Sequence, residues 1–115
     1  MKENAVLCTL GALMSRDIPE PDWKVFRQLS RIALDRYCQR ILDEIALIAT
    51  DTKETAHERY GKIFEVVQQR DRTIAEAFDG MRRSTAILQL LIVCSHGLLT
   101  DEEIGKFTQN TRDVI

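Results

Sequence analysis

Apolar residues recur at helical spacing along nearly the whole chain. The pattern predicts helices over Asn4–Arg16, Asp22–Ala49, Ala56–Asp79 and Ser84–His96. Pro19 and Pro21 separate the first two segments, because each proline disfavours helical backbone in the residue before it. Gly97 suits the left-handed residue that ends the last of these helices. No segment has a pattern that would let it pair with another as a β-strand. The sequence therefore predicts an all-α fold.

The longest segment carries two apolar stripes. The main one comprises Trp23, Phe26, Ala33, Tyr37, Ile41, Ile45 and Ile48. A second stripe of Val25, Leu29 and Ile32 ends where Arg36 begins, and a short apolar stripe bordered by charge is typical of an interface with a polar rim. We therefore predict that these three residues contact a second copy of the chain. In the alternative, Asn4–Arg16 folds back and covers the same stripe.

The segment Ala56–Asp79 has the clearest amphipathic pattern in the chain. Its apolar stripe comprises Ala56, Tyr60, Ile63, Phe64, Val67, Ile74 and Phe78. Arg70 and Asp71 interrupt the stripe at its middle, one on either edge. Three interpretations stay open: they remain solvated, they pair across a helix–helix or subunit interface where they set register, or they take part in catalysis.

Ser84–His96 is apolar almost all round and is broken only by Gln89, which predicts a fully buried central helix. Beyond it, Thr100-Asp101-Glu102-Glu103 fits the capping box and predicts a fifth helix that carries Ile104 and Phe107. The residues from Leu99 resemble the opening of a helix-turn-helix. Thr108 and Gln109 stand where that motif has an apolar residue and its turn glycine, so no family is assigned.

The chain has 115 residues, which predicts one domain over residues 1–115: a bundle of four main helices plus a short terminal helix. Lys and Arg number 16 against 18 Asp and Glu, a net charge of −2 that excludes a dominant basic or acidic tail. The basic residues Lys24, Arg27, Arg31, Arg36 and Arg40 nevertheless repeat along one helix. They could contact phosphate, or they could form a solvated face that pairs with Asp35.

The sequence has few residue patterns that would indicate catalysis or metal binding. Cys8, Cys38 and Cys94 are far apart in apolar settings, which favours reduced thiols in a cytoplasmic protein. The E-x-x-H spacing of di-iron bundles occurs only once, at Glu54–His57. Cys94 and His96 are near neighbours on one helix and do not face each other as catalytic partners would. We predict no catalytic residue, metal site or cofactor.

These patterns favour a non-enzymatic small helical protein that acts through protein–protein contacts, most simply as a homodimer. The alternative is a nucleic-acid-associated regulator that uses the Arg-rich face of the long helix. A small enzyme of unknown reaction is the third interpretation. The longest apolar run is too short to span a bilayer, so a membrane is not an expected partner.

Overall fold

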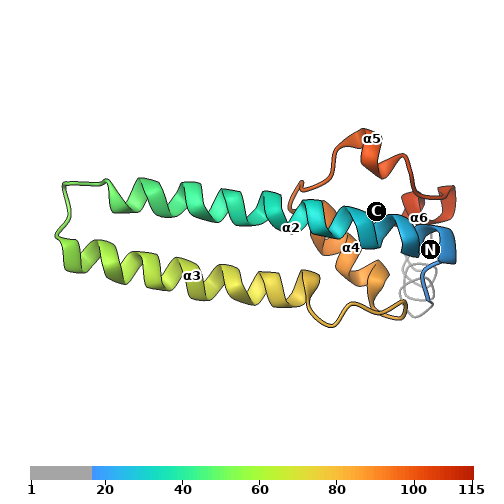
Figure 1. Ribbon diagram of the computed structural model, residues 1–115, viewed down its shortest axis with the longest axis horizontal. Helices are drawn as coiled ribbons and strands as arrows, with labels where there is room; N and C mark the ends of the chain where they lie inside the picture. Colours follow the sequence, from blue (N-terminus) through green and yellow to red (C-terminus); the bar gives the residue numbers. More distant parts are fainter. Residues whose placement is uncertain (1–16) are drawn as a thin grey trace, which may run out of the picture.

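The computed structural model describes residues 17–115, and this range is helical without strands (Figure 1). The helices are α2 (Glu20–Ala49), α3 (Ala56–Phe78), α4 (Ala86–Ser95), α5 (Asp101–Ile104) and α6 (Gln109–Val114). The predicted all-α class is confirmed. The predicted helix over Asn4–Arg16, including Cys8, lies outside the described residues.

The predicted count of four main helices is not matched within residues 17–115, where three helices have seven or more residues. The C-terminal segment divides into two short helices. Helix α5 ends at Ile104, so Phe107 lies beyond it in the turn before α6. The backbone N–H of Thr108 donates to the Asp22 carboxylate at 2.8 Å rather than to a helical carbonyl, and α6 begins after it.

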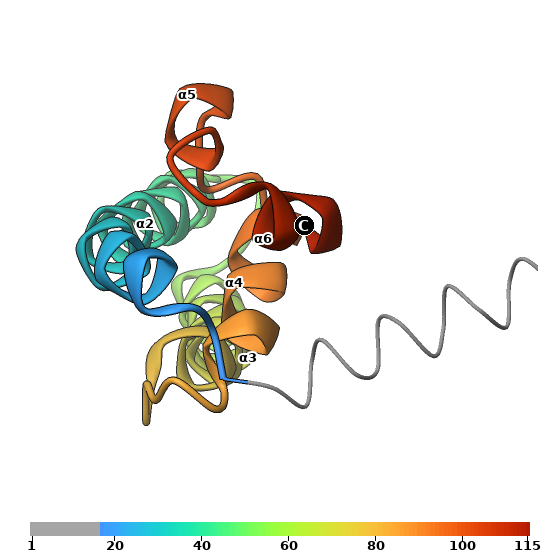
Figure 2. The same cartoon turned by 90° about the vertical axis from the view of Figure 1, so that its right-hand side faces the viewer.

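Helices α2 and α3 form an antiparallel hairpin (Figures 1 and 2). Thr55 caps α3 by accepting a hydrogen bond from the Glu58 backbone N–H at 3.1 Å. The 30 residues of α2 span about 45 Å, whereas the 10 residues of α4 span only about 15 Å. Helix α4 therefore flanks only the first half of α2. The rest of the hairpin, residues 38–74, extends as a two-helix arm; we call residues 17–37 and 75–115 the compact end.

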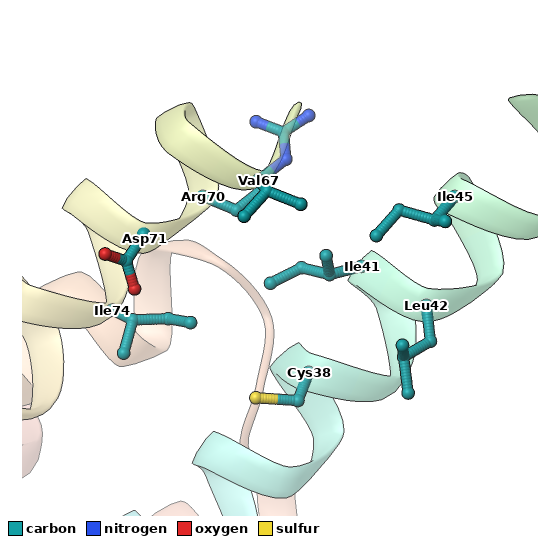
Figure 3. A pocket seen from close by; sticks show the side chains of 8 residues that line it. All are labelled: Cys38, Ile41, Leu42, Ile45, Val67, Arg70, Asp71 and Ile74. Atoms are coloured by element: carbon teal, nitrogen blue, oxygen red, sulfur yellow. The ribbon is translucent and has the colours of Figure 1, made fainter. Parts of the chain in front are cut away.

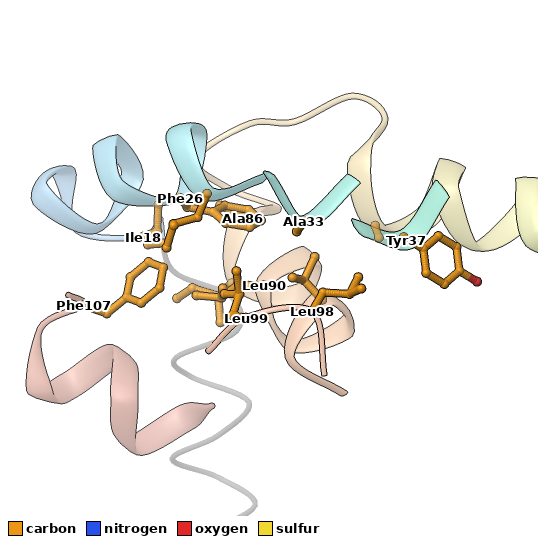
Figure 4. Packing of buried hydrophobic residues seen from close by; sticks show 13 residues of the cluster. Ile18, Phe26, Ala33, Tyr37, Ala86, Leu90, Leu98, Leu99 and Phe107 are labelled. Carbon is orange, nitrogen blue, oxygen red and sulfur yellow. The ribbon is translucent and has the colours of Figure 1, made fainter. Parts of the chain in front are cut away.

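The hydrophobic core lies in the compact end (Figure 4). Its buried apolar residues are Ile18, Phe26, Leu29, Ala33, Tyr37, Ala77, Ala86, Ile87, Leu90, Val93, Leu98, Leu99 and Phe107. No residue from 38 to 76 is buried. The described residues therefore form one core, and the arm projects beyond it.

Helix α4 lies at the centre of this core, but it is not enclosed on every side as predicted. Leu88 is 50% exposed, while Gln89, its one polar interruption, is buried. The Gln89 amide donates to the Asp79 carbonyl at 2.9 Å and accepts from the Thr85 hydroxyl at 3.2 Å. Burial is tolerated because both ends of the amide have partners.

A buried carboxylate attaches the C-terminal segment to the start of α2. Asp22, only 1% exposed, accepts hydrogen bonds from the backbone N–H and hydroxyl of Thr108, at 2.8 and 2.6 Å. It also accepts one from the Thr111 hydroxyl at 2.5 Å. These bonds satisfy a charge that would otherwise be costly to bury, and they hold α6 against the first turn of α2.

Candidate functional site

One face of the arm carries an apolar groove between α2 and α3 (Figure 3). The groove has a volume of about 290 Å³ and is lined by Cys38, Ile41, Leu42, Ile45, Val67, Arg70, Asp71 and Ile74. We call these residues, together with Tyr60 and Phe64 further along α3, the arm face. Of them, Leu42 is 58%, Phe64 53% and Val67 45% exposed. The face is therefore open to a partner.

The arm face exists because each helix has an apolar stripe wider than one neighbouring helix can cover. Ile41 and Ile45 point from α2 toward Val67 and Ile74 on α3 (Figure 3). These residues form the contact between the two helices, and the outer part of each stripe is left to solvent. Among residues 17–115 no third helix covers this side of the two-helix layer, whereas an amphipathic helix usually packs its whole stripe into a core.

Arg70 and Asp71, the polar interruption of the α3 stripe, have different environments. The Arg70 guanidinium donates to both carboxylate oxygens of Glu44 on α2, at 3.2 and 3.1 Å, and this bonding raises the pKa of Arg70. Figure 3 shows the guanidinium turned away from Asp71. The Asp71 carboxylate is exposed beside the groove and has no hydrogen-bond partner among residues 17–115. Arg70 thus pairs across two helices of one chain.

Val25, Leu29 and Ile32 do not form the continuous exposed stripe that the sequence predicts. Leu29 is only 4% exposed and belongs to the core, and Val25 is half-buried against it. Ile32, at 44% exposed, is the one member open to solvent. The chain after α4 covers this side of α2, since Arg36 donates from the same side to the Leu98 carbonyl. On the arm, by contrast, Leu42, Phe64 and Val67 are each between 45% and 58% exposed.

The five basic residues of α2 separate into two groups. Arg36 donates to the two carboxylate oxygens of Glu103, at 2.6 and 3.1 Å. Arg40 donates to the carbonyls of His96 and Gly97, at 2.5 and 3.0 Å. These two arginines therefore hold the end of α4 and the start of α5 against α2, a structural role that the sequence did not indicate.

The Arg36–Glu103 pair also changes the acidity of the carboxyl. The hydrogen bond from Arg36 lowers the pKa of Glu103 from 4.5 to about 2, with help from the Thr100 backbone N–H. That N–H donates to Glu103 at 2.8 Å, and the Thr100 hydroxyl accepts from the Glu103 N–H at 3.2 Å. The predicted capping box is confirmed. Its glutamate additionally pairs with Arg36, 67 residues earlier in the chain.

Lys24, Arg27 and Arg31 form the second basic group. All three are exposed, and with Gln28 they line a hollow of about 340 Å³ on the outer flank of α2. The Arg27 guanidinium lies 5.9 Å from the centre of the Trp23 ring. Lys24 makes only a long contact of 3.9 Å with Glu20, and Arg27 and Arg31 have no acidic partner among residues 17–115. Their charge is therefore available to a ligand.

The remaining candidates show no catalytic arrangement. Glu54 pairs with Lys62 while His57 is exposed, and the His96 ring packs edge-on against Tyr37 with 5.4 Å between ring centres. Burial raises the pKa of the Cys94 thiol. Within the described residues, no group of three or more His, Cys, Asp or Glu side chains is placed to hold a metal ion.

None of the helices between residues 17 and 115 combines the length and apolar character needed to cross a membrane. No family model, curated protein or solved structure matches the chain.

Proposed function

We propose that this protein acts through protein–protein contacts rather than catalysis, and that two copies associate through the arm face. The observation that carries the proposal is the row of large apolar side chains left open on one face of the arm. Leu42, Phe64 and Val67 are each between 45% and 58% exposed. Contiguous apolar surface of this kind marks an interaction site more often than scattered exposed residues do.

The chemistry of the arm face favours a second copy as the occupant. Asp71 is its one charged side chain without a partner inside the described chain, so the face has almost no charge to attract an oppositely charged protein. An identical arm offers the same neutral, apolar surface. In a two-fold dimer the same patch of each copy contacts its counterpart. Two stacked hairpins would form a four-helix arrangement in which the arm face of each copy covers that of the other.

The size of the arm face sets the expected strength of the dimer. About 15 residues of α3, from Tyr60 to Ile74, span roughly 22 Å, and two adjacent helices are roughly 20 Å wide. Each copy would bury about 400–500 Å², or about 800–1,000 Å² in total, which is below the roughly 1,200 Å² of stable interfaces and typical of weak, transient ones. We therefore expect a reversible dimer with a dissociation constant in the micromolar range.

The test is the oligomeric state of purified full-length protein by sedimentation velocity between about 5 and 500 µM. The wild type should shift from monomer to dimer, and the double variant Leu42→Glu/Val67→Glu should remain monomeric with unchanged helicity. Leu47→Glu is the matched control: Leu47 lies on the same arm and is 75% exposed, but it is turned about 140° around α2 from Leu42 and does not line the groove. It should dimerise like the wild type.

A wild type that is monomeric at every concentration overturns the dimer. The apolar N-terminal sequence is then the next occupant to test, with the full-length variant Leu7→Asp/Leu10→Asp. If this variant dimerises where the wild type does not, and Leu42→Glu/Val67→Glu abolishes that dimer, then the N-terminal sequence covers the arm face in the wild type. Equal loss of association in Leu47→Glu would show that the contact does not use the arm face.

A further inference from the structure

The first half of α2 carries a charged surface that the proposed dimer does not use. Lys24, Arg27 and Arg31 follow one another at intervals of three and four residues, so they lie on one flank and span about 10 Å of helix. Gln28 adds an amide to the same hollow of about 340 Å³. All four side chains are exposed, and they lie before residue 38, where the arm begins.

The two arginines of this hollow differ from Arg36, Arg40 and Arg70 in making no side-chain hydrogen bond within residues 17–115. Arg36, Arg40 and Arg70 each donate to acceptors in the chain. Arg27 and Arg31 have no such acceptor within residues 17–115, and Glu20 is the one acid in contact with the group, through Lys24 at 3.9 Å. That contact is solvated, since both side chains are about two-thirds exposed or more. It therefore neutralises little of the local charge.

The arrangement matches the chemistry of phosphate. Guanidinium groups donate two parallel hydrogen bonds to phosphoryl oxygens, and lysine adds a mobile point charge. The Trp23 ring, 5.9 Å from the Arg27 guanidinium, restricts that side chain and reduces the entropy lost when it binds. The whole chain has a net charge of −2, so an anion would be drawn to this flank and not to the surface in general.

We propose that Lys24, Arg27 and Arg31 form a phosphate-binding site that accepts the phosphoryl groups of a nucleic-acid strand or of a free polyphosphate. The binding is electrostatic and independent of base sequence, because the hollow presents cations and one amide. Three phosphate contacts to a single strand give a slope of about −2 for the logarithm of affinity against the logarithm of salt concentration. Affinity should therefore fall roughly twentyfold between 50 and 200 mM salt.

Fluorescence anisotropy of a labelled 20-nucleotide single strand at 50 mM salt tests the site in the full-length protein. Arg27→Gln/Arg31→Gln should weaken binding at least tenfold and reduce the salt slope to about −0.7. The control Arg72→Gln/Arg82→Gln removes the same charge from exposed positions outside the hollow and should bind within twofold of the wild type. Circular dichroism checks that all variants stay folded.

Unlabelled tripolyphosphate separates the two sources of the phosphoryl group. Displacement of the strand by tripolyphosphate at similar phosphate concentration supports a site for free polyphosphate. Retention of the strand, together with loss of binding in Arg27→Gln/Arg31→Gln, supports the nucleic-acid backbone. Equal weakening in the control variant, or binding of neither ligand at 50 mM salt, overturns the site. The Leu42→Glu/Val67→Glu variant should retain binding, so failure of the dimer and failure of this site are distinguishable.

Discussion

Helix α2 passes through both parts of the molecule and has the same kind of apolar stripe in each. In the compact end, Phe26, Ala33 and Tyr37 from that stripe are at most 6% exposed. In the arm, Ile41 and Ile45 continue the stripe at the same spacing but are only half-buried. The side chains are at least as apolar in the second half, so the difference arises from what surrounds them.

The compact end surrounds α2 with α3, α4 and the segment that follows α4, whereas the arm offers α3 alone (Figures 1 and 2). Burial therefore depends on the number of neighbours and not on periodicity alone. The compact end should contribute most of the folding free energy of the monomer. In the arm, part of the apolar surface stays exposed to solvent. Substitutions in the compact end and in the arm should therefore differ in their effect on the free energy of unfolding.

The largest difference is expected between two leucine truncations. Leu90 is fully buried on α4, so Leu90→Ala should cost about 3 kcal/mol of unfolding free energy through lost burial and a cavity. Leu42 is 58% exposed on the arm, and Leu42→Ala should cost less than about 1 kcal/mol in the monomer. Urea denaturation at a few micromolar protein measures both. Equal costs would show that the arm is as important to the fold as the core.

The buried carboxylate of Asp22 comes next. Asp22→Ala leaves the hydroxyls of Thr108 and Thr111 without their acceptor and should cost about 2 to 3 kcal/mol. Amide hydrogen exchange should also become faster in α6. Asp35→Ala, an exposed change on the same helix, is the control and should stay within about 0.5 kcal/mol of the wild type. Unchanged exchange in α6 would contradict the role of Asp22.

The Arg36–Glu103 pair predicts a pH dependence of the compact end. The folded pKa of Glu103, about 2, lies below its usual 4.5, so the stabilisation is complete above pH 4.5 and is lost as the pH falls toward 2. Partial solvation reduces the benefit to about 1–2 kcal/mol near pH 7. Glu103→Gln keeps the capping box and removes the charge. The stability gap between wild type and variant should close between pH 4.5 and 2; a constant gap would contradict the pairing.

The smallest effect is expected for the corresponding pair in the arm. Arg70 and Glu44 are 38% and 37% exposed, and such solvated pairs contribute about 0.5 kcal/mol. A double-mutant cycle with Arg70→Ala and Glu44→Ala should give a coupling energy of that size, falling with added salt. A coupling above about 2 kcal/mol would show that the pair, and not apolar contact, holds the two arm helices together.

Local signals in the sequence predicted much of the fold. The long helix was expected over Asp22–Ala49 and spans Glu20–Ala49, and the next differs from its prediction by one residue at its end. Thr100 forms the expected capping box, and Gly97 adopts the expected positive φ of 63° after α4. Each of these depends on residues a few positions apart, which is why periodicity and capping rules identify them.

The same local patterns identified only part of the candidate sites. The basic residues of α2 were identified together, but the sequence could not show that Arg36 and Arg40 are engaged with residues at least 56 positions away. It placed Leu29 on an interface, whereas the chain after α4 places it in the core. It found the α3 stripe but could not show that Phe64 on this stripe stays half exposed.

The sequence by itself determined where α2, α3 and α4 start and end to within two residues, and which side of α2 and α3 is apolar, because those properties follow from neighbouring residues. Only the tertiary structure decided which apolar sides are covered and which charges are free. Helix α4 is too short to reach the arm, so the arm face stays open. The segment after α4 crosses α2 at Arg36 and Arg40, so Lys24, Arg27 and Arg31 keep their charge available. Both outcomes depend on contacts between distant segments, which local sequence patterns do not encode.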